Sequence, residues 1–206
     1  MQLAHNQEFI NKLGFKKETL ISLFIPNTYE FFWNTNAKQF FEKMKKEQGI
    51  FWKKNNREKK AADLNMTKAE VYTLASIVER ETNQNDEKKR IAGVYLNRLK
   101  KGILLQADPT VVFATRDFAA RRVLNRHINF DSPYNTYKYA GLPPGPISMA
   151  SISSIDAVLN AEKHSYLYFC AKPDNSGHHA FAKTLAGHNR NANKFRNWLN
   201  KQRIMR

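Results

Sequence analysis

The stretch "LASIVERET" (Leu74–Thr82) joins an apolar helical pattern to two acidic residues, Glu79 and Glu81, that flank an arginine. Just upstream, "TKAE" (Thr67–Glu70) has the form of a capping box, whose Thr and Glu side chains satisfy backbone donors at a helix start. Together these signals predict a helix that begins in the box, ends near Thr82 and buries an apolar stripe. This helix carries carboxylates into its last turn.

The two carboxylates differ in their angle from the apolar stripe. Because an α-helix advances about 100° per residue, Glu81 falls about 50° from the centre of the stripe and Glu79 about 110° from it. Glu79 is therefore expected to be a solvated flank residue, and Glu81 to be half-sunk among apolar side chains. Burial raises the pKa of a carboxyl, so Glu81 could donate a proton near neutral pH. The alternative is structural: Glu81 ends the helix and pairs with Arg80, Lys88 or another basic residue.

Two further helices are predicted downstream. Asn85 or Asp86 is expected to cap a helix that stops at Gly102 and packs against the first helix as a hairpin. In "ADPT", Asp108 is expected to act as the N-cap of a short helix with Pro109 at its first position. Asp108 is also the nearest candidate for the second acid of ordinary glycoside hydrolysis, although capping explains its place well.

The segment 116–147 is rich in turn formers and runs into "SPYNTYKYAGLPPGPIS" (Ser132–Ser148). Its prolines lack amide donors and its glycines permit unusual dihedral angles. A rigid loop of this kind that carries Tyr134, Tyr137 and Tyr139 suits the wall of a binding cleft better than a linker. The alternative is that its Tyr-Asn-Thr sequence, with Asn135 at the centre, only holds its own turns together.

The remaining segments complete a mixed α+β pattern. Upstream, "PNTYEFFWNTNAKQFFEKMKKEQGIFW" combines a turn with an amphipathic helix. Downstream follow a helix from about Met149 to Glu162, two strands in "SYLYFCA" and "HHAFAK" around the turn "KPDNSG", and a basic helix from about Thr184. The prediction is a helix-rich domain with a small antiparallel β element.

Composition narrows the range of partners. The 206 residues include 34 Lys and Arg against 18 Asp and Glu, a net charge of +16 that attracts nucleic acid, an anionic membrane surface or a carboxylate-bearing polymer. The basic residues are dispersed and form no known nucleic-acid-binding motif, so no nucleic-acid partner is expected. Cys170 is the sole cysteine and excludes an intrachain disulfide. No run of about 18 apolar residues occurs, so the chain as given is expected to be soluble.

No metal or other cofactor is expected. Three histidines, His178, His179 and His188, could suggest a metal site, but adjacent His178 and His179 would point to opposite faces of a strand, and no Cys or carboxylate accompanies them at ligand spacing. A hydrogen-bonding role for one of these histidines stays open. The sequence also contains no glycine-rich phosphate loop and no nucleophile elbow.

Four motifs resemble those of one family. "LASIVERET", "VYLNRLKKGILLQADPTVVFA", "SPYNTYKYAGLPPGPIS" and "YLYFCAKPDNSGHHAFAKTLAGHN" are similar, in order and spacing, to the endolytic murein transglycosylases (the MltG or YceG-like family) over roughly residues 26–191. The resemblance implies a catalytic domain over residues 26–206, preceded over residues 1–25 by a linker or the remnant of a LysM-like subdomain. Members normally carry an N-terminal membrane helix, absent from this chain, that holds them at the periplasmic (outer) face of the bacterial cytoplasmic membrane. An Asp typical of the family is replaced by Asn27, outside the implied acid site.

The resemblance also implies a reaction. It is the cleavage, without water, of the β-1,4 bond between N-acetylmuramic acid and N-acetylglucosamine in nascent peptidoglycan strands. The products carry 1,6-anhydromuramyl ends, strand elongation terminates, and peptidoglycan synthases are the expected protein partners. In the family the catalytic acid is a Glu followed by a small hydroxyl residue. Glu81 with Thr82 matches this pattern, whereas Glu79 with Arg80 does not.

Further polar residues are candidates to position the sugars, among them His179, which with Phe181 resembles a family "GHxF" spacing. The candidate substrate-binding residues are Gln106, Asp108, Tyr134, Asn135, Tyr137 and His179. Two other functions stay open. A non-catalytic peptidoglycan-binding scaffold would tolerate the loss of Glu81, and a hydrolytic muramidase would leave reducing ends.

Overall fold

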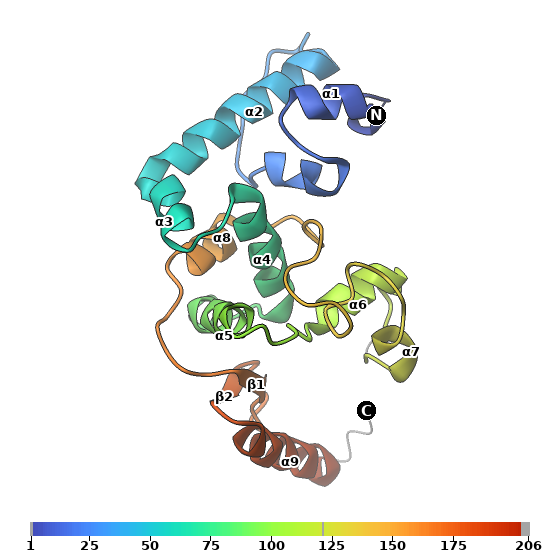
Figure 1. Ribbon diagram of the computed structural model, residues 1–206, viewed down its shortest axis with the longest axis vertical. Coiled ribbons are helices and arrows are strands. Elements are labelled where there is room, and N and C mark those ends of the chain that lie inside the picture. Colours follow the sequence, from blue (N-terminus) through green and yellow to red (C-terminus); the bar gives the residue numbers. More distant parts are fainter. Residues whose placement is uncertain (1, 121, 203–206) are drawn as a thin grey trace.

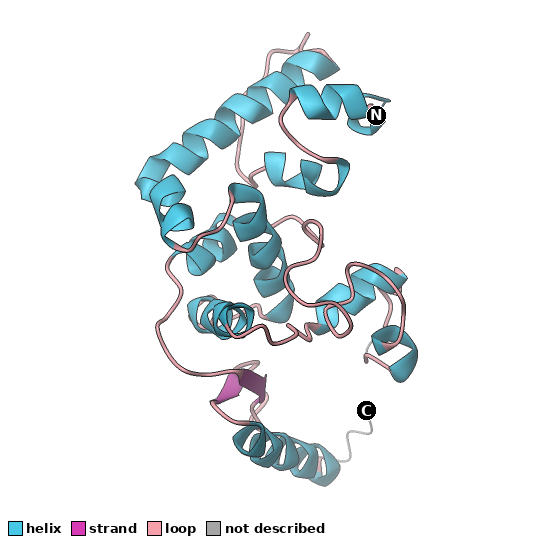
Figure 2. Ribbon diagram, in the orientation of Figure 1, coloured by secondary structure: helices cyan, strands magenta, loops and turns pink. Residues whose placement is uncertain are grey.

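The computed structural model describes residues 2–120 and 122–202 and is elongated, with the N-terminal helices at one end and the C-terminal helix at the other (Figure 1). Helices dominate the described residues, and their one sheet is a two-stranded antiparallel ribbon (Figure 2). The prediction of a helix-rich α+β fold is confirmed. The elements are η1 (Gln2–His5), α1 (Gln7–Lys12), η2 (Lys17–Leu23), α2 (Ala37–Lys53), η3 (Lys54–Asn56), α3 (Arg57–Asp63), α4 (Lys68–Glu81), α5 (Lys88–Lys100), α6 (Asp108–Thr115), α7 (Asn125–Ile128), α8 (Ile152–Leu159), β1 (Tyr168–Ala171), β2 (His179–Ala182) and α9 (Leu185–Lys201).

Helix α4 lies at the centre of the main core. The predicted capping box is confirmed, because the Thr67 hydroxyl accepts from the Glu70 amide and the Glu70 carboxylate accepts from the Thr67 amide. All residues of 71–78 are buried, so the helix is enclosed on every side here and not only along the predicted stripe. Its polar members are paired: the Tyr72 hydroxyl, for example, donates to the Phe24 carbonyl at 2.8 Å.

Several predicted helix limits are wrong, and a distant contact explains the clearest case. Neither Asn85 nor Asp86 caps α5; the helix begins at Lys88, and Glu87 precedes it without a side-chain cap. The Glu87 carboxylate instead accepts from the His179 amide on β2 at 3.0 Å, which ties the start of α5 to the ribbon. The helix predicted over 149–162 is also shorter, since α8 begins after Ser151, whose hydroxyl accepts from the amide of the third helical residue.

The N-terminal elements enclose a second, smaller core. Residues of α1 and η2 pack there against Phe41 and Met44 of α2. Residues 1–25 therefore include segments that share a core with the helix that follows them. A LysM-like origin for residues 1–25, and a domain boundary at residue 25, stay predictions. None of the helices in the described part of the chain has the length and apolar character that spanning a bilayer requires.

The C-terminal elements form the opposite end of the molecule. Strands β1 and β2 pair antiparallel, with Phe169 opposite Phe181, as the two-strand prediction required. The basic helix predicted from about Thr184 is confirmed, and Thr184 is its N-cap, with a hydroxyl that accepts from the Gly187 amide at 3.1 Å. Helix α9 packs against both strands of the ribbon (Figure 1).

Gly145 offers a test of how tightly the proline-rich loop packs against η2. A Cβ at this buried position would lie 2.1 Å from the backbone oxygen of Glu18, which cannot move without shifting η2. We expect Gly145→Ala to lower the free energy of unfolding by about 2 kcal/mol, the usual cost of overpacking. Gly49→Ala is the matched control, because nothing lies within 4 Å of its added Cβ and alanine favours the helix there. Equal denaturant midpoints for the two variants would contradict this account.

Candidate active site

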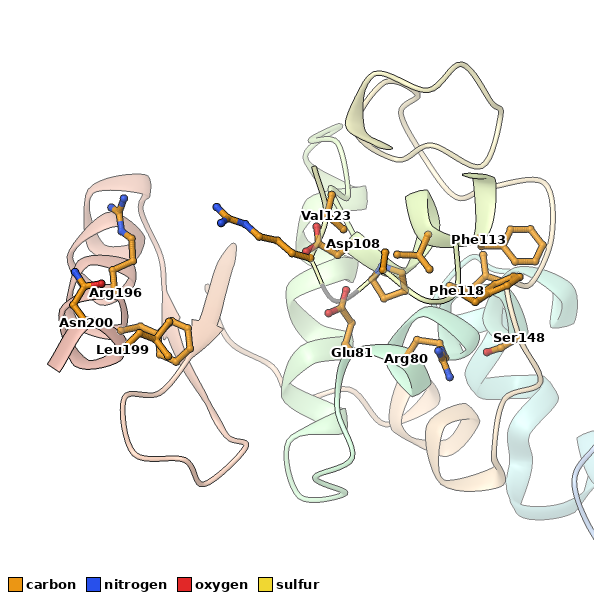
Figure 3. Close-up of a pocket in the computed structure, with 16 residues that line it drawn as sticks. Arg80, Glu81, Asp108, Phe113, Phe118, Val123, Ser148, Arg196, Leu199 and Asn200 are labelled. Carbon is orange, nitrogen blue, oxygen red and sulfur yellow. The ribbon is translucent and has the colours of Figure 1, made fainter. Parts of the chain in front are cut away.

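Glu81 is the last residue of α4 and lies where two cavities meet. The larger cavity has a volume of about 1310 Å³ and the smaller about 380 Å³, and both are lined by Glu81 and Asp108. Figure 3 shows Glu81 between α9, with Arg196 and Leu199, and the segment that carries Phe113. A carboxyl at this place can reach a bound ligand from the end of a rigid helix.

The surroundings of Glu81 favour its protonated form. Burial raises the pKa of Glu81 to about 7, with the negative charge of Asp108 adding to the effect and a hydrogen bond from Tyr95 opposing it. The Tyr95 hydroxyl donates to Oε1 of Glu81 at 2.5 Å. Among the described residues Glu81 makes no ion pair, so the alternative in which it pairs with Arg80, Lys88 or another basic residue is wrong for this part of the chain. The carboxyl can thus hold a proton near neutral pH and release it to a ligand.

Glu79 has the opposite environment and corrects the expectation of a solvated residue. It is half-buried, and its Oε2 accepts from the hydroxyls of Ser151 and Ser154 and from the ammonium of Lys88, which is itself 5% exposed. Although burial raises the pKa of Glu79, these hydrogen bonds outweigh it and hold the pKa below its usual value. The pKa values of these two carboxyls, in one helix turn, are thus displaced in opposite directions. This difference suits Glu79 to a structural role as an anion and Glu81 to proton transfer.

Asp108 does not cap α6, contrary to expectation. Ala107 occupies the N-cap position, Asp108 is the first helical residue, and no side-chain cap bond is made. The Asp108 carboxylate accepts instead from the Tyr137 hydroxyl of the proline-rich loop, across the mouth of the smaller cavity. Two sequence-predicted residues, Asp108 and Tyr137, are therefore brought together beside Glu81.

Gln106 also lines the smaller cavity, and its backbone is unusual. Its φ of 52° lies in the left-handed region, which a residue with a side chain rarely adopts and which recurs at functional sites. Two contacts hold it: the Gln106 amide donates to the Thr136 carbonyl at 3.0 Å, and its Oε1 accepts from buried Arg98 at 3.2 Å. Its side-chain nitrogen has no acceptor among the described residues and can donate to a ligand.

Asn135 and Tyr134 lie outside the lining of both cavities. Asn135 is fully buried and donates to the carbonyls of Ile128 and Phe130, both at 2.7 Å, while its side-chain oxygen accepts from the Tyr137 amide. Its polar atoms are thus engaged in holding the loop that presents Tyr137. Tyr134 is half-buried, with its ring centroid 4.8 Å from that of Phe113 on α6.

His179 also lies outside the lining of both cavities. Its Nδ1 is 2.9 Å from the buried carboxylate of Glu87, and its ring stands edge-on to Phe169. The described residues contain no cluster of three or more His, Cys, Asp or Glu side chains placed to hold a metal ion.

The smaller cavity also has polar lining residues that are not among the predicted site residues, including Tyr95, Arg98, Tyr168 and His188. Only the folded chain brings the Tyr95 hydroxyl to Glu81. The His188 ring stacks on Tyr168, and its Nδ1 is buried without a hydrogen-bond partner in the described structure. Burial, and then the charge of nearby Arg98, lower the pKa of His188, so the ring is neutral at neutral pH. A local signal for His188 existed in the motif "AGHN".

Several known proteins are similar to this chain. The model of the YceG-like family matches residues 1–194. An endolytic murein transglycosylase of Bacillus subtilis (strain 168) is 38% identical over 180 residues, which are 87% of this chain and 49% of that protein. A protein of the same name from Streptococcus pneumoniae (strain D39) is 36% identical over 131 residues, 62% of this chain and 24% of its own.

A solved structure shares the fold. The crystal structure of a YceG-like protein from Listeria monocytogenes superposes with a TM-score of 0.73 at 33% identity, over 92% of this chain and 63% of the other. The chain thus spans about half the length of the Bacillus relative and about a quarter of the pneumococcal one. The match of the family model over nearly the whole sequence shows that this chain belongs to the YceG-like family.

Proposed function

We propose that this protein is an endolytic lytic transglycosylase, which cuts peptidoglycan strands between N-acetylmuramic acid and N-acetylglucosamine. The observation that carries the proposal is Glu81, whose pKa is raised to about 7 and which lies on the wall of two joined cavities with no ion-pair partner among the described residues. An acid of this kind is matched to proton transfer near neutral pH. Membership of the YceG-like family and the names of its relatives support the same reaction.

In the first step, Glu81 donates its proton to the oxygen that bridges the two sugars. The bond between this oxygen and C1 of the muramyl residue breaks, and positive charge develops on C1 and the ring oxygen. The leaving N-acetylglucosamine keeps the proton as its new hydroxyl. The Asp108 carboxyl group borders the same space and is placed to stabilise the developing positive charge.

In the second step, the ionised Glu81 accepts the proton of the muramyl C6 hydroxyl while that oxygen bonds to C1. The product end is a 1,6-anhydro ring, and the carboxyl recovers the proton it gave away. Since the nucleophile belongs to the substrate, one carboxyl serves both steps and no water is consumed. The Tyr95 hydrogen bond, 2.5 Å long, stabilises Glu81 in the ionised interval between the steps.

The other residues of the site fall into two groups. Gln106, Tyr137 and His188 line the smaller cavity and are proposed to bind sugar hydroxyls and amides. Asn135, Tyr134 and His179 have their polar or aromatic parts engaged inside the fold, so we propose that they position the cavity walls.

The same proposal extends to the cell. We propose that the reaction takes place at the outer face of the cytoplasmic membrane, on strands still held by peptidoglycan synthases, and that it terminates their elongation. The net charge of +16 supports this setting, since both the lipid surface and peptide-bearing peptidoglycan are anionic.

A hydrolytic muramidase is the second candidate, and one observation favours it. Asp108 borders both cavities with Glu81 and thus supplies the second carboxyl that hydrolysis of a glycoside commonly uses. In that reaction a water molecule would add to C1 and the muramyl product would keep a reducing end.

Mass spectrometry of the products separates these candidates. We expect peptidoglycan strands incubated with the protein to yield fragments with 1,6-anhydromuramyl ends, each lighter by one water than the hydrolytic product. Borohydride reduction serves as an internal check, because reducing ends gain hydrogen and anhydro ends do not. Fragments with reducing ends would establish the muramidase, and intact strands would leave the scaffold function.

A further inference from the structure

The larger cavity has features that cleavage of a bare glycan does not use. Its volume of about 1310 Å³ exceeds the roughly 300–1,000 Å³ of typical small-ligand pockets. Its wall is mixed: apolar side chains of α6, the following loop and α9 are interrupted by three arginines, Arg80, Arg122 and Arg196. The acidic side chains in this lining are Glu81 and Asp108, both at the junction with the smaller cavity.

The arginines are distributed around the acid. Arg80 directly precedes Glu81, is exposed, and has no hydrogen bond or ion pair with any described residue. Arg196 is exposed on α9, where its guanidinium donates to Asn193 of the same helix. In Figure 3, Arg80 extends toward Ser148 on one side of Glu81, whereas Arg196 lies on the other side of the cavity. A ligand that reaches away from Glu81 in either direction therefore meets a guanidinium.

We infer that this cavity binds the stem peptide of the muramyl residue, and that the protein acts on peptide-bearing strands in preference to bare ones. This inference rests on the proposed function. The peptide is attached to the same sugar whose glycosidic bond Glu81 protonates, so it must lie beside that residue. Its free carboxylates match guanidinium groups, which bind carboxylates through paired hydrogen bonds, and its small apolar side chains match the apolar wall.

Two substrates test the inference. The first is a preparation of uncrosslinked strands with their stem peptides, and the second is the same strands after an amidase has removed the peptides. We expect the wild-type protein to cleave peptide-bearing strands at least about tenfold more efficiently, as kcat/KM for release of anhydromuramyl ends, since two charge-assisted contacts are gained. Raising the salt concentration should narrow this ratio, because the contacts are partly exposed.

Variants locate the effect. Arg80→Gln and Arg196→Gln are each expected to raise KM for peptide-bearing strands about fivefold and to leave cleavage of bare strands unchanged. Arg190→Gln is the matched control, since it removes an exposed arginine of α9 that lines neither cavity. This control should leave both substrates unaffected.

The outcomes distinguish the inference from the function on which it rests. Equal kcat/KM for the two substrates, or equal losses on both in the arginine variants, would overturn the peptide site while the transglycosylase function stands. The peptide site would also be overturned if Arg190→Gln raised KM as much as Arg196→Gln, because the loss of net charge alone would then explain the higher KM. Absence of anhydro ends from both substrates with the wild-type protein would overturn the proposed function itself.

Discussion

Glu81→Gln is expected to lower the rate of strand cleavage by about 10³-fold, because the amide can neither donate the proton in the first step nor recover one in the second. Gln has nearly the same shape as Glu and keeps an oxygen that can accept from the Tyr95 hydroxyl, so the cavity should be preserved. The measurement is the rate of appearance of 1,6-anhydromuramyl ends, compared with the wild-type protein at the same pH.

The same variant should be more stable at alkaline pH. The folded protein holds the pKa of Glu81 at about 7 against 4.5 for an ordinary Glu, so between these values the folded state binds more protons than the unfolded state. Wild-type stability therefore falls as the pH rises from about 4.5 to 7, by at most about 3 kcal/mol, and then levels off. Glu81→Gln removes this loss. A gain in Tm at pH 8 together with lost cleavage would show that the acid is retained for chemistry.

Glu79→Gln is the matched control, two residues away on the same helix. It should keep the cleavage chemistry but lower the free energy of unfolding by about 3 kcal/mol, since buried Lys88 loses its anionic partner. The assignment of the acid is wrong if Glu81→Gln retains wild-type cleavage while a folded Glu79→Gln protein has none.

The rate of cleavage is expected to fall about tenfold for each pH unit above 7. Only the protonated form of Glu81 can begin the reaction, and the pKa of about 7 sets the pH at which this form is half populated. Below pH 7 the protonated form predominates, so Glu81 contributes no acid limb to the profile of kcat. A second carboxylate that must be ionised would add an acid limb in either reaction, so the chemistry of the product ends, and not the shape of the profile, separates the two candidates.

Tyr95→Phe sharpens this test. The Tyr95 hydroxyl lowers the pKa of Glu81 by donating to its ionised form, so its removal should move the alkaline limb upward by about one pH unit. Tyr139→Phe is the control, because the exposed Tyr139 hydroxyl donates to Asp131 and lines neither cavity. An alkaline limb that stays in place in Tyr95→Phe would show that a different group titrates.

The parts of the fold that could be predicted from the sequence are those with local causes. The capping box at Thr67, the basic helix from about Thr184 and the two-stranded ribbon each rest on residues close together in the sequence, and the structure contains all three. The angle of Glu81 from the apolar stripe is likewise a property of one helix. It correctly anticipated a carboxyl with a raised pKa.

The errors about Glu79 and Asp108 have the opposite origin, because each of these residues has a partner far along the chain. Glu79 was expected in solvent but meets Ser151 and Ser154, more than 70 residues away in sequence. Asp108 was expected as a cap but accepts from Tyr137, which lies 29 residues further along the chain. Helical periodicity and capping rules contain no information about such distant partners. A polar residue whose hydrogen bonds are all made within the protein therefore looks the same in the sequence as one that is free to bind substrate. Asn135 shows the same ambiguity, since its amide is fully engaged by Ile128 and Phe130.

The hydrogen bonds that anchor Glu79, two residues from Glu81, bear on how this segment can change during evolution. Since a helix turns by about 100° per residue, one inserted or deleted residue between Leu74 and Glu79 would rotate both carboxylates together. Glu79 would then lose its contacts with Ser151 and Lys88, and Glu81 would point away from the cavity. Substitutions in this stretch can be compensated by neighbours, but a change of length cannot. The spacing of these residues should therefore be stricter than their identity.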